Sequence, residues 1–261
     1  MRRFFVYLLL ILSLGVASSA PALGDTTYFI YDQYGGTWQD ANKTWVDDSQ
    51  MCWAAAASNV LAYEKWGTSQ YNTGQTIFQY LGDHWTNNAG YIYWAYNWWL
   101  NGTQPPYQTY AYPDVAGGNF FPSQKASSYE VNASGGNLMA TADSLLRKGD
   151  GVTMTIRNGS YAHAVTLWGF SQNALGAYTG VYITDSDDGM FGLVNYAIAY
   201  QNSAWYLMDG YIAGWYISDL EALAAGASAV PLAPSWVLFG TGVFALYVMR
   251  RRPGKGESHS L

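Results

Sequence analysis

A single cysteine, Cys52, stands at the start of an alanine-rich stretch, and this stretch constrains the fold more than any other part of the chain. Alanines occupy positions 54–57, and alanine has the highest helix propensity, so we expect a helix over residues 52–66. Ser49 or Asp48 is expected to cap its N-terminus. The thiol then lies in the first turn, where free N–H groups and the helix dipole lower the pKa of a cysteine.

Both ends of the chain have the composition of targeting segments. Residues 1–22 combine two arginines with an apolar run and small-residue cleavage sites, which predicts a secretory signal peptide. Residues 230–252 form an apolar run closed by three arginines, which predicts a transmembrane segment followed by a short cytoplasmic tail, residues 253–261. Residues 25–225 remain for one domain, which this topology places outside the membrane.

The body of the chain is rich in aromatic residues and poor in charge. The sequence holds 12 Trp and 23 Tyr, with 11% charged residues and a net charge of −6. This balance, without a basic patch, argues against nucleic-acid binding. The aromatic residues fit two interpretations, a tyrosine-rich folded surface or stacking platforms for a polysaccharide or peptide.

An exported chain with one cysteine has no internal disulfide. Its thiol is therefore buried, reactive or paired with another chain. An idle exposed thiol is a liability in an oxidising compartment, which favours a cysteine kept for chemistry, with a buried structural cysteine as the alternative.

Helical patterns come first along the chain and strand patterns follow. A short strand is expected over residues 28–31, and helices over 75–85, 91–100 and 138–148. Strands are expected over residues 152–156, 162–170 and 180–184, with one or two more within 206–217. This order predicts an α+β fold, in which a helical N-terminal half packs on an antiparallel sheet.

A thiolate nucleophile needs a base, and the sequence has three histidines. His259 lies beyond the apolar tail, and His84 lies at the end of a predicted helix, where a surface or capping role is expected. His163 lies in a predicted core strand between two alanines, which leave room for the imidazole to face a cleft. The alternative for His163 is a hydrogen-bonded core histidine.

A catalytic imidazole also needs an acceptor for its second nitrogen. Residues 184–189 follow the next predicted strand and contain Asp185, Asp187 and Asp188. Adjacent antiparallel strands would place Asp185 beside His163. The alternatives are a solvated acidic turn or a calcium-binding loop, although the segment is too short for an EF-hand loop.

The order of cysteine on a helix, histidine on a strand and carboxylate after the next strand is that of papain-like enzymes. Residues 38–45, 52–61, 163–169 and 181–187 together resemble the IdeS/Mac family of papain-like cysteine endopeptidases. The resemblance implies a papain-like fold and no cofactor or metal. The residues that match the family pattern are Cys52 as nucleophile, His163 as general base and acid, Asp185 as orienting carboxylate, Asp187 as a second acidic position and Lys43 as an oxyanion-stabilising cation.

Gln50 is a second candidate for oxyanion stabilisation, by analogy with the glutamine of papain. The immunoglobulin substrate of the family is not carried over, because the region between residues 66 and 138 is far more aromatic than the family pattern.

The tail resembles a PEP-CTERM or VPLPA-type sorting signal, in residues 230–234, the apolar run and the closing arginines. Such tails imply a Gram-negative bacterium and handling by an exosortase. The expected location is outside the inner membrane, either anchored in the periplasm or, after tail processing, at the cell surface or secreted.

These features together predict an exported cysteine endopeptidase that acts on a protein or peptide through an acyl-enzyme. One alternative keeps the acyl-enzyme but transfers it to an amine, as in a transpeptidase or amidase. Another is a non-catalytic surface module that binds polysaccharide or protein through its aromatic face.

Overall fold

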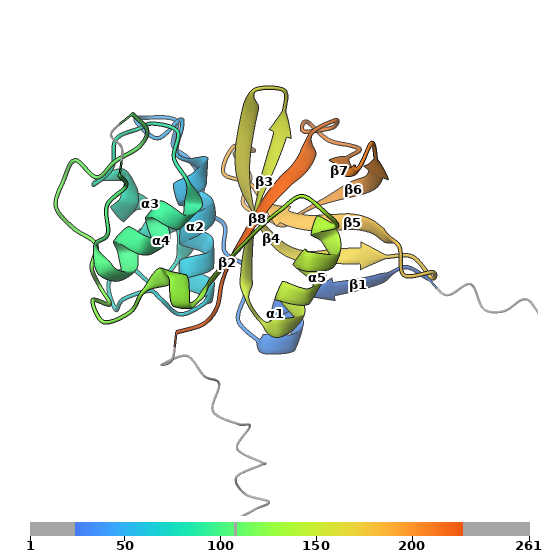
Figure 1. The fold of residues 1–261 in the computed structure, drawn as a ribbon, viewed down its shortest axis with the longest axis horizontal. Coiled ribbons are helices and arrows are strands. Elements are labelled where there is room, and N and C mark those ends of the chain that lie inside the picture. Colours follow the sequence, from blue (N-terminus) through green and yellow to red (C-terminus); the bar gives the residue numbers. More distant parts are fainter. Residues whose placement is uncertain (1–23, 107–108, 227–261) are drawn as a thin grey trace, which may run out of the picture.

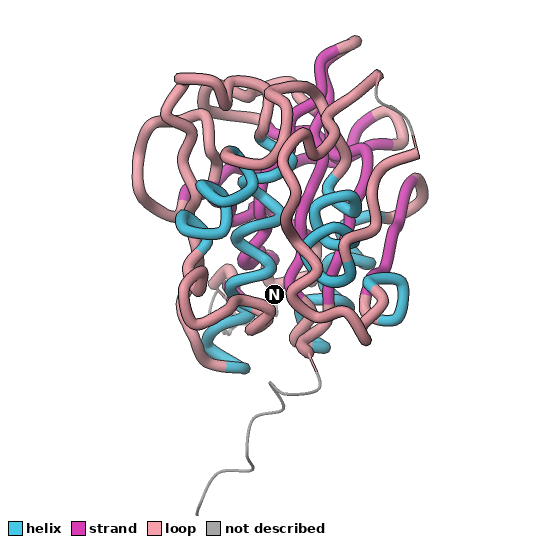
Figure 2. Tube along the Cα trace, turned by 90° about the vertical axis from the view of Figure 1, so that its left-hand side faces the viewer, coloured by secondary structure: helices cyan, strands magenta, loops and turns pink. Residues whose placement is uncertain are grey.

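Helices and strands separate into two layers, which lie side by side in Figure 1. The computed structural model describes residues 24–106 and 109–226. The helical layer contains α2 (Cys52–Tyr63), α3 (Gly74–Gly82) and α4 (Ile92–Asn101) with their connecting loops. Figure 2 looks onto this layer, with the strands behind it. The short α1 (Ile30–Tyr34) and the longer α5 (Leu138–Lys148) pack instead on the strands.

The second layer is a closed antiparallel barrel. Its strands follow the order β4-β3-β8-β7-β6-β5, and β5 pairs again with β4, so the ring of six is complete. Two further strands, β1 and β2, pair with β4 and β8 outside the ring. The bounds are β1 (Thr26–Phe29), β2 (Glu130–Ser134), β3 (Gly151–Asn158), β4 (Tyr161–Gln172), β5 (Tyr178–Thr184), β6 (Val194–Gln201), β7 (Ala204–Leu207) and β8 (Tyr216–Leu223).

The expected papain-like α+β fold is wrong, because the sheet closes on itself into this barrel. Closure depends on β4, which is 12 residues long and pairs with β3, β5 and β1. The register of β4 against β5 shifts between Leu167 and Gly169, and such irregularities bend a strand. A Cβ at Gly169 would lie 2.2 Å from the carbonyl oxygen of Tyr28, so the close approach of β1 requires glycine there.

Within residues 24–106 and 109–226, no helix is long and apolar enough to cross a membrane. The predicted signal peptide at residues 1–22, the predicted transmembrane segment at 230–252 and the tail at 253–261 lie outside the described residues.

Most of the predicted elements are confirmed, with shifted ends. Helix α2 begins at Cys52 as expected, but its N-cap is Met51, which makes no side-chain cap. Asp48 instead accepts hydrogen bonds from the backbone and hydroxyl of Thr44, at 2.6 and 2.9 Å. The helix ends at Tyr63, three residues early, and Lys65 has a positive φ of 61°. Helix α1 and strands β2 and β6 are additions to the predicted set, and α1 takes residues 30–31 of the strand predicted over 28–31.

Each layer has its own hydrophobic core. The helical layer is filled by tryptophans and alanines, and the barrel mainly by aliphatic side chains. Every residue of α2 after Cys52 is buried, which the small side chains of positions 54–57 permit. The fully or nearly fully buried tryptophans are Trp53, Trp66, Trp85, Trp94, Trp98, Trp99 and Trp168. Core packing therefore accounts for these tryptophans, whereas the buried tyrosines are Tyr63, Tyr96 and Tyr196.

Glu64, which caps the C-terminus of α2, is a carboxyl group inside the protein. It is 3% exposed, it accepts a hydrogen bond from the backbone of Gly151, and its Oε1 is buried without a partner. Burial raises the pKa of Glu64 to about 9. The folded protein therefore keeps the Glu64 proton at neutral pH, whereas the unfolded chain releases it.

Glu64 is expected to make the protein less stable as pH rises from about 4.5 to 9. In this window the folded state binds more protons than the unfolded state, so each pH unit lowers the free energy of unfolding by up to about 1.4 kcal/mol. Urea unfolding between pH 5.5 and 8 should show a shallower decline for Glu64→Gln than for the wild type. The exposed Asp114→Asn serves as the control. An unchanged decline in Glu64→Gln would contradict the assignment.

Candidate active site

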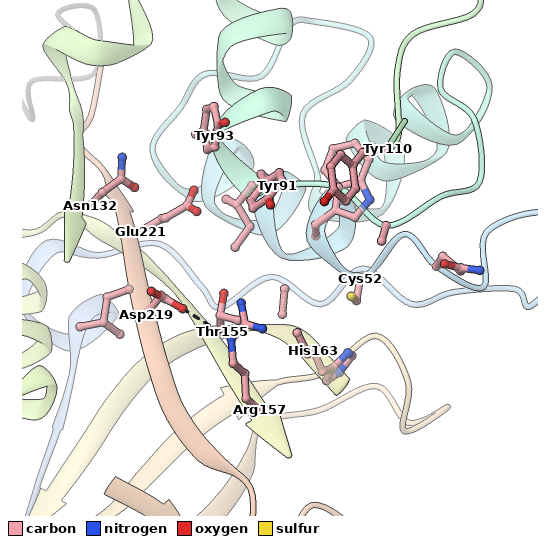
Figure 3. A pocket seen from close by; sticks show the side chains of 18 of the residues that line it. Cys52, Tyr91, Tyr93, Tyr110, Asn132, Thr155, Arg157, His163, Asp219 and Glu221 are labelled. Carbon is pink, nitrogen blue, oxygen red and sulfur yellow. Dashed lines mark ion pairs between the residues drawn. The ribbon is translucent and has the colours of Figure 1, made fainter. Parts of the chain in front are cut away.

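A cleft of about 790 Å³ runs between the helical layer and the barrel. Figure 3 shows its two walls, with Cys52 and three tyrosines from the helical layer above and strand residues of the barrel below. The helical wall comes from the start of α2, residues 89–93 and Tyr110. The barrel wall comes from β2, β3, β4 and β8. Both polar and apolar groups face this space, as in most small-molecule and peptide sites.

Cys52 is the first residue of α2 and is partly exposed to the cleft, with its sulfur on the side of His163 (Figure 3). The carbonyl of Met51 accepts hydrogen bonds from Ala54 and Ala55, both at 3.0 Å. The N–H groups of Cys52 and Trp53 precede these bonds and have no intrahelical acceptor. The start of α2 therefore presents donors beside the sulfur.

His163 and Asp185 form a buried pair beside Cys52. His163 lies on β4, and Asp185 directly follows β5, the strand that pairs with β4. The imidazole Nε2 lies 2.6 Å from Asp185 Oδ1. Asp185 also accepts hydrogen bonds from the backbone of Asp187, at 2.9 Å, and from the hydroxyl of Tyr211. Because Nε2 is held by Asp185, Nδ1 is the imidazole nitrogen left for the sulfur.

The pKa values of Cys52, His163 and Asp185 are each shifted in the direction that favours the charged form of the group. Burial raises the pKa of the Cys52 thiol, but the hydrogen bond and charge of His163, with smaller effects of Ala164 and Lys43, lower it overall. Burial lowers the pKa of His163, but its hydrogen bonds to Asp185 and Cys52 raise it well above its ordinary value. Burial likewise opposes ionisation of Asp185, and the His163 hydrogen bond still holds its pKa low. The site therefore favours thiolate, imidazolium and carboxylate together.

Lys43 and Asp187 form a second ion pair at the same site. The Lys43 side chain is 2% exposed, and its ammonium group also donates to the carbonyl of Ser49 at 2.9 Å. The other carboxylate oxygen of Asp187 lies 3.8 Å from His163 Nδ1. Charges of opposite sign thus alternate from Lys43 through Asp187 to His163 and Asp185.

A buried amide ties the three elements of the site together. Asn59 Nδ2 on α2 donates to Thr166 Oγ1 on β4 at 3.0 Å and lies 3.4 Å from Thr184 Oγ1 at the end of β5. Its Oδ1 accepts from the backbone of Ala41, two residues before Lys43, at 2.9 Å. Thr184 in turn accepts from Trp168 and donates to the Gln39 carbonyl, both at 2.9 Å.

His163, Asp185 and Asp187 also have the composition of a metal site. Each offers one ligand atom, and these atoms lie within 4.8 Å of one another. A cation bound there would displace the Lys43 ammonium from Asp187 and break the bond between His163 and Asp185. The present contacts therefore suit proton chemistry better than metal coordination.

The structure thus brings all five sequence-predicted residues, Lys43, Cys52, His163, Asp185 and Asp187, into one site. Gln50 also lines the cleft. His84 lies elsewhere, stacked on Tyr80 with its Nδ1 2.7 Å from the Tyr80 carbonyl. His259 lies outside the described residues.

Sequence reasoning missed Tyr211 and Asn59. Tyr211 lies between β7 and β8, and nothing in its local sequence marks it as a partner of Asp185. Asn59 did carry a signal, because it is a polar residue in the middle of an apolar helix.

A scan against protein-family models gives no match for this chain, and a search of the curated proteins finds no relative.

The reactivity of Cys52 is expected to depend on His163. Alkylation by iodoacetamide should follow an inflection below the ordinary thiol pKa of about 8.5, because the imidazolium favours the thiolate. In His163→Gln the inflection should move upward, and in the urea-unfolded protein it should return to the ordinary value. Cys52 is the only cysteine, so mass spectrometry reads it directly. The same inflection in wild type and His163→Gln would contradict the pairing.

Tyr211→Phe is expected to destabilise the protein at pH 7. The tyrosine hydroxyl donates to an ionised Asp185 at neutral pH, and a hydrogen bond to a charged group is stronger than one to a neutral group. Because the Tyr211 residue is 57% exposed, we expect a loss of about 1 kcal/mol. Thermal and urea unfolding at pH 7 measure it, with the exposed Tyr161→Phe as control. A loss no larger than that of Tyr161→Phe would speak against a bond to the carboxylate.

Proposed function

We propose that this protein is a cysteine endopeptidase that hydrolyses peptide bonds through Cys52, His163 and Asp185. One observation carries the proposal: Asp185 holds His163 Nε2 at 2.6 Å, which leaves Nδ1 for the thiol of Cys52, a cleft-lining residue at the start of a helix. This is the arrangement of nucleophile, base and orienting acid that acyl transfer requires.

In the first half of the reaction, the Cys52 thiolate attacks the carbonyl carbon of the scissile peptide bond. The His163 imidazolium then gives its Nδ1 proton to the nitrogen of the leaving amine, and the carbon–nitrogen bond breaks. Asp185 keeps the ring in position and stabilises its charged form. The products of this step are a free amine and a thioester on Cys52.

In the second half, neutral His163 removes a proton from water, and the resulting hydroxide attacks the thioester. The carbon–sulfur bond breaks, the carboxylic acid leaves, and the thiolate and imidazolium are restored. The ion pair is therefore the resting state of the enzyme, which agrees with the lowered pKa of Cys52 and the raised pKa of His163.

The oxyanion of each tetrahedral intermediate forms beside the start of α2. The N–H groups of the first turn and the Gln50 side chain are the candidate donors, since Gln50, Cys52 and Trp53 line the cleft. Lys43 acts at longer range, because its ammonium group is engaged by Asp187 and Ser49. Its positive charge still lowers the pKa of the Cys52 thiol.

The resemblance to the IdeS/Mac family supports this chemistry at the residues named and is itself part of the proposal. It is not extended to a papain-like fold, which the closed barrel contradicts. Export from a Gram-negative cell, with sorting of the tail by an exosortase, belongs to the same proposal and rests on residues 1–22 and 230–252.

The thioester on Cys52 has a second possible fate, in which an amine instead of water attacks it and receives the acyl group. The tyrosines at the cleft leave an open aromatic wall that would accept an acyl acceptor as readily as a leaving peptide. Addition of a primary amine during cleavage separates the two, since a transferase gives the amide product and a hydrolase the free acid.

Cys52→Ala is expected to abolish cleavage of a peptide library by the full-length protein, a loss of at least about 10⁴-fold, because the covalent step has no substitute. Mass spectrometry of the library identifies the cleaved bonds. Unfolding of Cys52→Ala should match the wild type, and the His84→Gln variant should cleave normally. Equal cleavage by Cys52→Ala and wild type would refute the proposed function.

A further inference from the structure

The end of the cleft away from the thiol holds a carboxyl group that the proposed chemistry does not use. Figure 3 shows Cys52 and His163 at one end and Glu221 with Asn132 at the other. All four residues line the same continuous cavity. A substrate that reaches the sulfur therefore has a path along the cleft to Glu221.

Among the described residues, Glu221 is the ionisable side chain of the cleft with no ion-pair partner. Lys43 pairs with Asp187, and His163 with Asp185. Arg157 Nε lies 3.9 Å from Asp219 Oδ2 and 3.2 Å from Ser218 Oγ. Among the residues that the structure describes, Glu221 has no cation within ion-pair distance. The charged residues that line the cleft are Lys43, Arg157, His163, Asp187, Asp219 and Glu221.

The surroundings of Glu221 hold its carboxyl group in place without neutralising it. On β8 it lies between Thr153 of β3 and Asn132 of β2. The backbone N–H of Tyr93 donates to the carboxyl group, and Oε2 is buried with no hydrogen-bond partner. One acceptor atom of this carboxyl group is therefore unsatisfied.

Burial and the nearby Glu130 raise the pKa of Glu221 to about 8. The group is thus costly to ionise when the cleft is empty. An arriving ammonium or guanidinium group would supply the missing positive charge and favour the ionised form.

The helical wall opposite Glu221 adds aromatic rings that attract cations. Tyr91 and Tyr110 are 44% and 42% exposed, and their ring centroids lie 5.7 Å apart. Tyr93 continues the row, 5.8 Å from Tyr91. Rings of this kind bind the alkyl chain and the charged head of lysine or arginine, by contact and by cation–π attraction.

We propose that this end of the cleft, formed by Glu221, Asn132, Tyr91 and Tyr93, is a subsite for a lysine or arginine side chain of the peptide substrate. The proposal rests on the proposed peptidase function and names its substrate preference. An acidic side chain finds no free cation at this end of the cleft, because Arg157 already lies beside Asp219.

The test measures binding instead of turnover, with the full-length Cys52→Ala protein. The probes are heptapeptides of alanine and glycine, capped at both ends, with a single lysine at each position in turn and a glutamine-containing partner for each. Calorimetry should find at least one position at which lysine binds about tenfold more tightly than glutamine, the effect of one charge-assisted contact. This advantage should disappear in Cys52→Ala/Glu221→Gln.

Cys52→Ala/Glu130→Gln is the matched control, because Glu130 carries the same charge nearby but does not line the cleft. It should keep the lysine advantage. The subsite is overturned if no position favours lysine, if the advantage persists in Glu221→Gln, or if Glu130→Gln removes it equally. Lysine binding at Glu221 without peptide cleavage by the wild type would instead refute the proposed function alone.

Discussion

The buried side chain of Asn59 is the contact on which the rest of the site depends. It joins α2, which carries the thiol, to β4, which carries the imidazole, and it reaches the end of β5, where the carboxylate follows. It also fixes the segment that leads to Lys43 through the backbone of Ala41. Each partner lost by this buried amide would lower the stability of the fold by about 1–3 kcal/mol. The hydrogen bonds of Asn59 therefore favour the observed arrangement of the two layers over others.

In this site, neighbouring groups of opposite charge shift the pKa values of Cys52 and His163 more than burial does. Burial alone would keep the thiol of Cys52 protonated and the imidazole of His163 neutral. The interaction of Cys52 with His163 reverses the first tendency, and the bonds of His163 to Asp185 and Cys52 reverse the second. The cleft lies where the helical layer meets the barrel, so these charges lie beside an open space at the boundary, and the hydrophobic core of each layer contains none of them.

Sequence reasoning predicted the features that depend on local patterns, and the site residues for which few candidates of the required type exist. One cysteine and three histidines made the pairing of Cys52 with His163 easy to predict, and the alanines after Cys52 predicted α2. Strand β6 carried a usable pattern, since Tyr196 and Ile198 are two apart and both buried. Closure of the barrel could not be predicted from local sequence patterns, because it depends on the pairing register of β4 against β5. Tyr211 reaches Asp185 from a loop without periodicity, and only the folded chain brings them together.

The order of the elements also has a consequence for biosynthesis. The N-terminal strand β1 pairs with β4, and Tyr28 lies opposite Phe170. Strand β1 therefore cannot complete this pairing until β4 has been synthesised. The sulfur is synthesised long before the imidazole, the acid and the tyrosine that surround it in the finished protein. Contacts between such distant segments form late in folding. A nascent chain that ends before β4 and β5 therefore carries a thiol without the imidazole and the carboxylate that shift its pKa in the folded protein.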